Sequence, residues 1–387
     1  MSGPRATLSG RSGLPQWAEP VIGISSRRAR IAVDDEGTGM AAFDDENDST
    51  DFGEHERLVD LVDVIASDEG LSGVIRIDRE GLPAVQRAYG LANRGVAVAN
   101  TVDTRFATAS GTKGFTALTV MSLVEAGLLS LDTTARSLLG SDLTLIDDGV
   151  TVEHLLGHRS GIGDYLDEDV IVDSNDFFLP VPVQQLATTE QFLAVLDGHP
   201  TKYPPGERFS YSNSGYVVLA LIAERAAGVP FHALVDQRVC QPAGLVDTAF
   251  LRSDESLGRV ALGYLDDEGM RTNVFHLPIR GNGDGGIYTT AADMRVFWDA
   301  LFADRIVSPG TVTRMTRAAS EVPQTSLRYG LGFWLSTDGA VSLHGFDAGV
   351  GFVTVHHLER RVTSTVLCNQ TRGAWPVSQR LAELLAD

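Results

Sequence analysis

Ser110 and Lys113 are the two residues of this chain whose types and spacing best fit nucleophilic chemistry. Small residues surround them, and apolar residues then recur near helical spacing from 115 to 124, which predicts a helix that ends at Gly127. Side chains three positions apart share one face of a helix, so the lysine amine can reach the serine hydroxyl. Ser110 would lie at the helix N-terminus, where free N–H groups and the helix dipole favour an anion.

The lysine supplies what the serine lacks. A serine hydroxyl is a weak nucleophile until a neighbouring base takes its proton. A lysine can be that base when burial or positive neighbours lower its pKa, whereas an arginine keeps its proton. The chain has only two lysines, Lys113 and Lys202, so a lysine at this position favours proton transfer. The alternative is a helix N-cap serine followed by a solvated lysine.

Composition limits the classes of function. With 387 residues, 43% of them hydrophobic, the chain can bury a large core as one large domain or two to three smaller ones. The formal net charge of −20 repels nucleic acids and anionic membranes, so we expect neither as a partner. Cys240 and Cys368 are too far apart in sequence to indicate a disulfide framework or a metal knuckle, and we expect buried free thiols.

The N-terminal segment, 1–55, differs from the rest of the chain. It is rich in glycine, serine and arginine up to Arg30 and strongly acidic after Asp34, which is typical of a disordered tail. It has no apolar core of a signal peptide, and no run in the chain reaches the length of a membrane span. The expected location is therefore the cytoplasm.

The remaining chain, 56–387, reads as strands, a helical middle, then strands again. Strands are predicted at 73–78, 84–89, 329–334, 351–355 and 362–367, and helices near 58–65, 110–127, 214–227 and 377–385. This order predicts an α+β fold in which an antiparallel sheet is assembled from both ends of the folded chain and flanked by helices. The predicted α/β part is about 56–108 and 285–387, and the helical part is about 109–284.

Five stretches together resemble the beta-lactamase-related, penicillin-recognising serine hydrolases, which include class C beta-lactamases, family VIII carboxylesterases and D-amino-acid peptidases. They occur in the order typical of that family, and the resemblance covers roughly 57–387. The stretches are Phe106-Ala-Thr-Ala-Ser-Gly-Thr-Lys113, Thr151-Val-Glu-His-Leu-Leu-Gly-His-Arg-Ser-Gly161, Tyr203-Pro-Pro-Gly-Glu-Arg-Phe-Ser-Tyr-Ser-Asn-Ser-Gly-Tyr216, Gly285-Gly-Ile-Tyr-Thr-Thr-Ala-Ala-Asp293 and Tyr329-Gly-Leu-Gly-Phe333. The resemblance implies a beta-lactamase/transpeptidase-like fold with the active site between the sheet and the helical part.

The resemblance also implies roles for individual residues. Ser110 would be the nucleophile, and Lys113 would hold its hydroxyl and share its proton. Tyr211 would be the partner base and later the acid, which requires its pKa to fall from about 10; a nearby lysine ammonium favours that fall. Asn213 would hydrogen-bond Lys113 and a substrate carbonyl. Which of Lys113 and Tyr211 carries the proton stays open, because the two titrations are coupled.

A third family element departs from its usual form. Members often carry Lys-Thr-Gly on the strand beside the site, and this chain has His344-Gly345-Phe346-Asp347 there instead. We expect His344 to steady the tyrosinate or donate to substrate, and an N–H around Asp347 to form the oxyanion hole with that of Ser110. The alternative is a strand-edge histidine before a glycine turn. Without the cationic lysine, the site favours neutral esters or amides over the beta-lactam carboxylate.

Other motifs carry less weight. Gly281–Gly286 satisfies G-x-G-x-x-G without a preceding strand, so a flexible loop beside the site is expected rather than a dinucleotide site. His154 and His158 have the spacing of a metal pair but no evident third ligand, and we expect neither metal nor cofactor. A G-x-S-x-G nucleophile elbow is missing from the sequence, which argues against an α/β-hydrolase.

These observations predict a serine hydrolase that forms a covalent acyl-enzyme, first of all a carboxylesterase on small acyl esters. A beta-lactamase or a D-amino-acid peptidase is the second candidate. A catalytically inactive binding protein on the same fold is the non-enzymatic alternative. The oligomeric state is not predicted.

Overall fold

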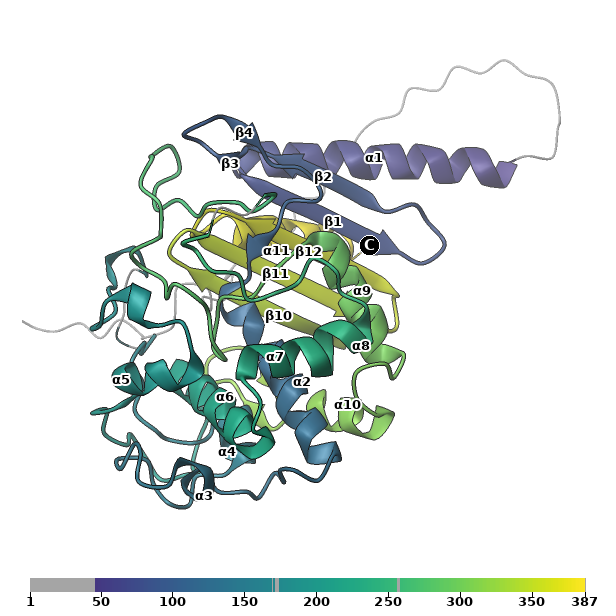
Figure 1. Ribbon diagram of the computed structural model, residues 1–387. Helices are drawn as coiled ribbons and strands as arrows, with labels where there is room; N and C mark the ends of the chain where they lie inside the picture. Colours follow the sequence, from purple (N-terminus) through teal and green to yellow (C-terminus); the bar gives the residue numbers. More distant parts are fainter. Residues whose placement is uncertain (1–45, 169, 171–173, 256–257, 387) are drawn as a thin grey trace, which may run out of the picture.

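The computed structural model describes residues 46–168, 170, 174–255 and 258–386. In this part of the chain an antiparallel sheet of eight strands has the order β2-β1-β12-β11-β10-β9-β8-β7. Figure 1 shows the part of this sheet from β2 to β10. Its strands are β1 (Gly73–Arg79), β2 (Val85–Tyr89), β7 (Ser320–Glu321), β8 (Arg328–Tyr329), β9 (Trp334–Leu335), β10 (Ala340–Asp347), β11 (Val350–His357) and β12 (Val362–Cys368). The sheet is therefore built from both ends of the folded chain, which confirms the predicted α+β class.

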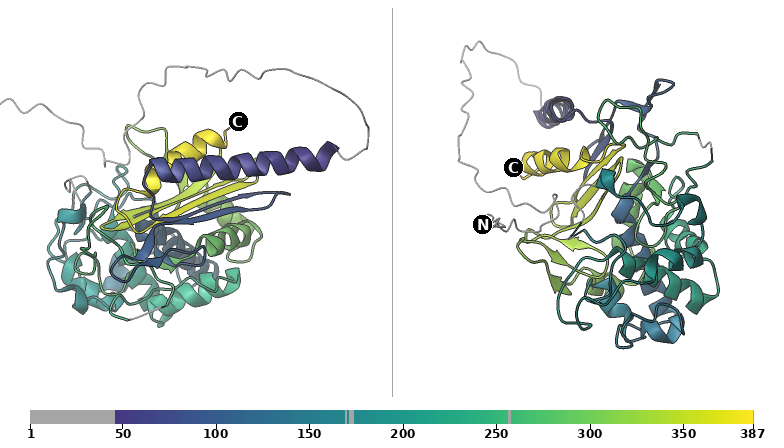
Figure 2. Two further views of the ribbon diagram at one scale, coloured as in Figure 1. Left: turned by 90° about the horizontal axis from the view of Figure 1, so that it is seen from above. Right: turned by 90° about the vertical axis from the view of Figure 1, so that its left-hand side faces the viewer.

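Helices cover both faces of this sheet. Figure 2 shows α1 (Glu46–Asp68) and α11 (Ala374–Leu384) on one face and the larger helical part on the other. The helical part contains α2 (Thr112–Glu125), α3 (Ala135–Leu139), α4 (Val152–Leu156), α5 (Leu193–Leu196), α6 (Asn213–Ala227), α7 (Phe231–Val235) and α8 (Gln241–Ala243). After it, α9 (Ala291–Phe302) packs on β1 and β12, and α10 (Pro309–Met315) follows.

The central helix of the helical part is α2, which begins directly after Ser110. Every residue from Thr112 to Leu123 is buried, so the helix is enclosed on all sides rather than on one stripe. It packs against α6 and β10. Two short strand pairs lie outside the eight-stranded sheet. One is the local pair of β3 (Leu91–Asn93) with β4 (Val98–Ala99). The other joins β5 (Phe106–Ala107), shortly before Ser110, to β6 (Tyr288–Thr289).

Two of the predicted elements need correction. Helix α1 begins at Glu46, inside the segment 1–55 that composition predicts as a tail, because a helix that has been nucleated gains one backbone hydrogen bond for each residue added. Residues 1–45 of the predicted tail lie outside the described residues. The predicted strand 329–334 is two strands, β8 and β9, since Gly332 turns the chain with φ +95°. The boundaries of the two predicted parts, near 109 and 284, stay predictions.

Within the described residues, no single helix has the length and apolar character to cross a membrane. The helices Asn213–Ala227 and Phe231–Ala243, bent by 84°, satisfy that test only as a pair and only by length and composition.

Strand β10 approaches the start of α2 through a glycine. A Cβ atom at Gly345 would lie 1.8 Å from the carbonyl oxygen of Thr108 and 2.8 Å from the amide nitrogen of Gly111. Only a residue without a side chain allows the strand to come this close to the backbone around Ser110.

Gly345→Ala should therefore lower the free energy of unfolding by about 1–3 kcal/mol and displace β10 from the Ser110 turn. Gly310→Ala is the control, because Gly310 lies in α10, a Cβ there would meet only Ser308 Oγ at 4.0 Å, and alanine favours a helix. Urea unfolding of both variants measures the difference, and equal stability of the two would contradict the close approach.

Candidate active site

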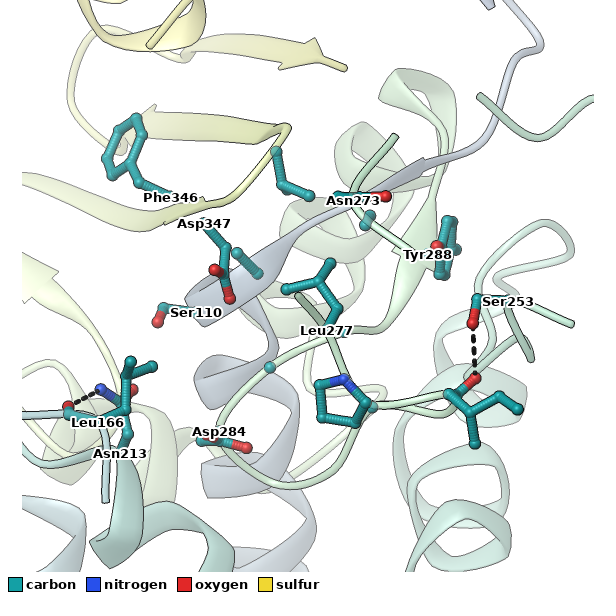
Figure 3. Close-up of a pocket in the computed structure, with 18 of the residues that line it drawn as sticks. Ser110, Leu166, Asn213, Ser253, Asn273, Leu277, Asp284, Tyr288, Phe346 and Asp347 are labelled. Carbon is teal, nitrogen blue, oxygen red and sulfur yellow. Dashed lines mark hydrogen bonds between the residues drawn. The ribbon is translucent and has the colours of Figure 1, made fainter. Parts of the chain in front are cut away.

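A strained turn presents Ser110. The residue before it, Ala109, has φ +43°, a left-handed conformation that is costly for a residue with a side chain. The turn η1 (Ala109–Gly111) is held by the hydroxyl of Thr112, which donates to the Ala109 carbonyl at 2.7 Å, and by the Thr108 N–H, which donates to Ile287 O at 2.9 Å. The side chain of Ser110 thereby lines a cavity at the N-terminus of α2 (Figure 3).

The amine of Lys113 lies beneath this serine and is 2% exposed as a residue. Its Nζ donates to Ser110 Oγ at 2.9 Å, to Asn213 Oδ1 at 2.7 Å and to the main-chain carbonyl of Asp284 at 2.9 Å. An ammonium has three N–H donors, and each finds an acceptor here. The predicted contact between Ser110 and Lys113 is thus present.

Burial lowers the pKa of Lys113 below its usual 10.5. The carboxylates of Asp284, Glu168, Asp164 and Asp347 act in the opposite direction, but desolvation is the largest influence. When one proton leaves, the two remaining N–H bonds can still serve Asn213 and Asp284, and the lone pair faces the hydroxyl of Ser110. The structure therefore suits Lys113 to act as a base.

Tyr211 contacts both Lys113 and Ser110, but its pKa is shifted in the direction opposite to the expected one. Its ring lies 4.8 Å from Lys113 Nζ, and it hydrogen-bonds Ser110. Burial raises its pKa well above 10, with the Glu168 carboxylate adding to the rise. The structure therefore does not support the expected fall in the pKa of Tyr211, because desolvation of the phenolate raises that pKa.

Asn213 is the first residue of α6, and a buried carboxylate sets its position. Asp164 accepts the Asn213 N–H at 2.7 Å and the Ser214 N–H at 3.0 Å, at a helix N-terminus where a negative charge is favoured. The side-chain amide of Asn213 donates to Leu166 O at 2.9 Å and Glu168 Oε1 at 3.1 Å. The predicted hydrogen bond between Asn213 and Lys113 is present. The side-chain NH₂ of Asn213, which was expected to bind a substrate carbonyl, instead donates to Leu166 and Glu168.

The structure does not bring His344 to the cavity wall. Successive side chains of β10 point to opposite faces of the sheet. The side chain of Leu343 faces α2, so close to Gly114 that a Cβ atom there would collide with it. His344 points to the other face, toward α11. There its ring stacks on Trp334 at 5.6 Å, meets Trp375 of α11 at 5.4 Å and pairs with Ser342 Oγ at 2.9 Å. If Gly345 is the glycine of the family's Lys-Thr-Gly pattern, the lysine position falls on Leu343, so the expected role of His344 is not supported.

The register of β10 also moves the expected oxyanion donor. Asp347 pairs with Val350 across a two-residue turn, so its N–H is directed toward β11. N–H groups alternate along an antiparallel strand, and that of Phe346 is therefore directed toward the open edge beside η1. For an oxyanion hole formed with the N–H of Ser110, this register favours the N–H of Phe346 over that of Asp347 as the second donor.

Three carboxylates line the cavity: Glu168, Asp284 and Asp347. Figure 3 shows the Asp347 carboxylate beside Ser110 and the Phe346 ring pointing away from it. Among the described residues that line this cavity, none is basic. Burial raises the pKa of Asp347 to about 7, and that of Asp284, which accepts a hydrogen bond from the Tyr165 hydroxyl, is also raised by burial. Sequence analysis named Asp347 only for its main-chain N–H, and it did not predict that the carboxylates of Glu168 and Asp284 line the site.

The motifs of lower weight have structural positions. Gly281–Gly286 is a loop at the cavity, and its residue Asp284 supplies the carbonyl that Lys113 contacts. His154 caps α4 through Thr151, whereas His158 follows the helix with φ +55°, so the two do not share a helix face. No group of three or more His, Cys, Asp or Glu that could hold a metal ion occurs in the described ranges. Cys240 and Cys368 are buried free thiols.

Comparisons with known proteins show the family to which the chain belongs. A family profile described as Beta-lactamase matches residues 61–386. The chain belongs to the beta-lactamase family. A penicillin-binding protein from Bacillus halodurans has a similar structure, with a TM-score of 0.79, 34% identity and coverage of 84% of this chain and 99% of that one.

Two curated relatives of this beta-lactamase-family hydrolase carry other activities in their names. Esterase EstB of Burkholderia gladioli is 33% identical over 55% of this chain and 55% of its own length. A D-aminopeptidase of Brucella anthropi is 27% identical over 82% of this chain and 59% of its own length. The chain thus spans little more than half of either relative.

Asp347→Asn should change how stability depends on pH. The native state of the wild type binds this proton more tightly than the unfolded chain, whose carboxyl has a pKa near 3.8, so the stabilisation is lost as pH rises toward 7. From pH 5 to pH 8, the free energy of unfolding of the variant should therefore rise by on the order of 1 kcal/mol relative to that of the wild type. Urea unfolding at both pH values measures it, and a constant difference would contradict a raised pKa.

Proposed function

We propose that this beta-lactamase-family hydrolase is a carboxylesterase that cleaves small acyl esters through a covalent acyl-serine intermediate. The observation that carries the proposal is the buried amine of Lys113 bonded to Ser110, in a cavity with no basic side chain among the described lining residues. The first feature supplies an activated hydroxyl, and the second supplies no partner for a substrate carboxylate.

Acylation follows from the positions of three side chains. Lys113, with its lowered pKa, takes the proton of Ser110 as Oγ bonds to the substrate carbonyl carbon. The resulting oxyanion is held by the N–H groups of Ser110 and Phe346. As the bond to the leaving group breaks, Tyr211 donates its phenolic proton to the departing oxygen and is reprotonated by Lys113. A water molecule then attacks the acyl-serine and releases the acid.

Lys113→Arg should lower kcat for ester hydrolysis by about 10²–10⁴-fold, because the guanidinium keeps the charge but cannot accept the serine proton. Lys202→Arg is the matched control, since Lys202 forms an ion pair with Asp167 that an arginine can also form. Steady-state kinetics and the rate of labelling by a fluorophosphonate are measured for both, with Ser110→Ala as the unlabelled reference.

Two outcomes would contradict this mechanism. Lys113→Arg with at least half of the wild-type kcat would exclude Lys113 as the base. Labelling that persists in Ser110→Ala would exclude Ser110 as the nucleophile, and a wild type that is neither labelled nor active would favour the inactive binding protein.

A second candidate, a peptidase acting on amino-terminal residues, is favoured by the carboxylates of Glu168, Asp284 and Asp347. A substrate ammonium would find negative charge beside Ser110, and the similarity to a D-aminopeptidase supports the same possibility. A beta-lactamase is favoured less, because beta-lactams carry a carboxylate that these residues repel.

The charge of the substrate should therefore control the rate. Three p-nitrophenyl esters of equal length, ending in a methyl, trimethylammonium or carboxylate group, should show kcat/KM lowest for the carboxylate by about tenfold or more at pH 8. The discrimination should weaken below pH 7 as Asp347 is protonated, and Asp347→Asn should reduce it at pH 8.

Asp304→Asn, which removes an exposed carboxylate away from the cavity, is the control and should leave the order unchanged. Nitrocefin and a D-alanyl amide complete the panel. Turnover of nitrocefin well above that of the neutral ester would contradict the carboxylesterase, and turnover of the amide above every ester would favour the peptidase.

A further inference from the structure

His158 makes two main-chain bonds to the residues on either side of Tyr211. Its carbonyl oxygen accepts the N–H of Ser210 at 2.9 Å, and its ring Nδ1 accepts the N–H of Ser212 at 3.0 Å. Both contacts depend on its backbone, which leaves the end of α4 in a left-handed conformation with φ +55°. One residue thus fixes the chain immediately before and immediately after the phenol.

The ring of His158 also packs directly behind that phenol. Its centroid lies 4.3 Å from that of Tyr211, 4.6 Å from Tyr329 and 4.9 Å from Tyr216, and the residue is 1% exposed. Trp334 stacks on Tyr211 at 5.9 Å. The Tyr211 ring is therefore held by packed rings as well as by its main chain.

The protonation state of the ring follows from these contacts. Because the Ser212 N–H is a donor, Nδ1 carries no proton, and the neutral ring has its proton on Nε2. Burial holds the pKa of His158 well below 6.5, and the positive charge of Lys113 adds to this. Nδ1 consequently remains an acceptor at neutral pH.

We propose that His158 is a positioning residue that holds the Tyr211 phenol against Ser110 and Lys113, through the main chain of Ser212 and through ring packing. The inference rests on the proposed role of Tyr211 as the acid that protonates the leaving group. A small displacement of that phenol lengthens its path to the departing oxygen, and displacements near 1 Å can reduce rates by about 10²-fold.

The test compares His158→Asn with His158→Gln. The amide oxygen of asparagine takes the position of Nδ1 and asparagine tolerates φ > 0, whereas the glutamine oxygen reaches the position of Nε2. Each variant is assayed on an alkyl ester, whose leaving group needs a proton, and on the p-nitrophenyl ester of the same acid, whose leaving group does not.

His158→Gln should lose about 10²-fold in kcat on the alkyl ester, much less on the p-nitrophenyl ester, and leave KM within about threefold on both. His158→Asn should recover most of the lost kcat. Tyr329→Phe, a change in the same ring cluster at a residue outside the 210–212 segment, should affect the two esters equally. Equal losses on both esters for His158→Gln, or identical behaviour of the two amide variants, would overturn the inference.

Tyr211→Phe on the same two esters separates this inference from the proposed function. Tyr211→Phe should lose far more kcat on the alkyl ester than on the p-nitrophenyl ester, even with His158 intact. A Tyr211→Phe variant without that preference would remove the phenol from the mechanism and with it the proposed function, whatever His158 does.

Discussion

The amine of Lys113 is the group on which the rest of this site depends. A buried lysine must satisfy its N–H donors within the protein, because water cannot reach them. Its three acceptors come from distant parts of the chain: Ser110 in η1, Asn213 at the start of α6 and the Asp284 carbonyl in the loop before β6. Correct packing of the sheet, the helical part and this loop is therefore required before the amine can be buried.

The same burial has two electrostatic consequences. Desolvation lowers the pKa of Lys113 and raises that of Tyr211, so both groups shift toward their neutral forms. For the amine, the nearby carboxylates oppose this shift because a negative charge favours the ammonium, and three of them line the cavity beside Ser110. The proposed activation of the hydroxyl and the proposed selection of substrates by charge therefore depend on the same carboxylates.

Much of this site could be predicted from the sequence because its chemistry is local. A serine and a lysine three residues apart share a helix face whatever surrounds the helix, and the scarcity of lysine marks Lys113. Tyr211 and Asn213 were found through the stretch 203–216, which precedes a long apolar helix. The antiparallel sheet followed from the order of strands and helices along the chain.

The parts that failed depend on tertiary geometry. Side chains on a strand alternate between faces, so a shift of one residue in the assignment of β10 exchanges His344 for Leu343 and Asp347 for Phe346. The pairing of β10 with β11 sets that register, and the close approach of Gly345 to Thr108 is consistent with it. The contribution of Asp284 to Lys113 is a main-chain carbonyl, which no residue type reveals, and the raised pKa of Tyr211 depends on how fully its ring is buried.

The titration of Lys113 itself tests the central claim most directly. Since the chain has two lysines, selective isotope labelling of lysine should give two side-chain signals in NMR, and the signal missing from Lys113→Arg identifies the buried amine. The account predicts a midpoint for that signal below 10.5, because burial disfavours the ammonium. A midpoint at or above 10.5 would contradict it, since the amine would then hold its proton too tightly to accept one from Ser110.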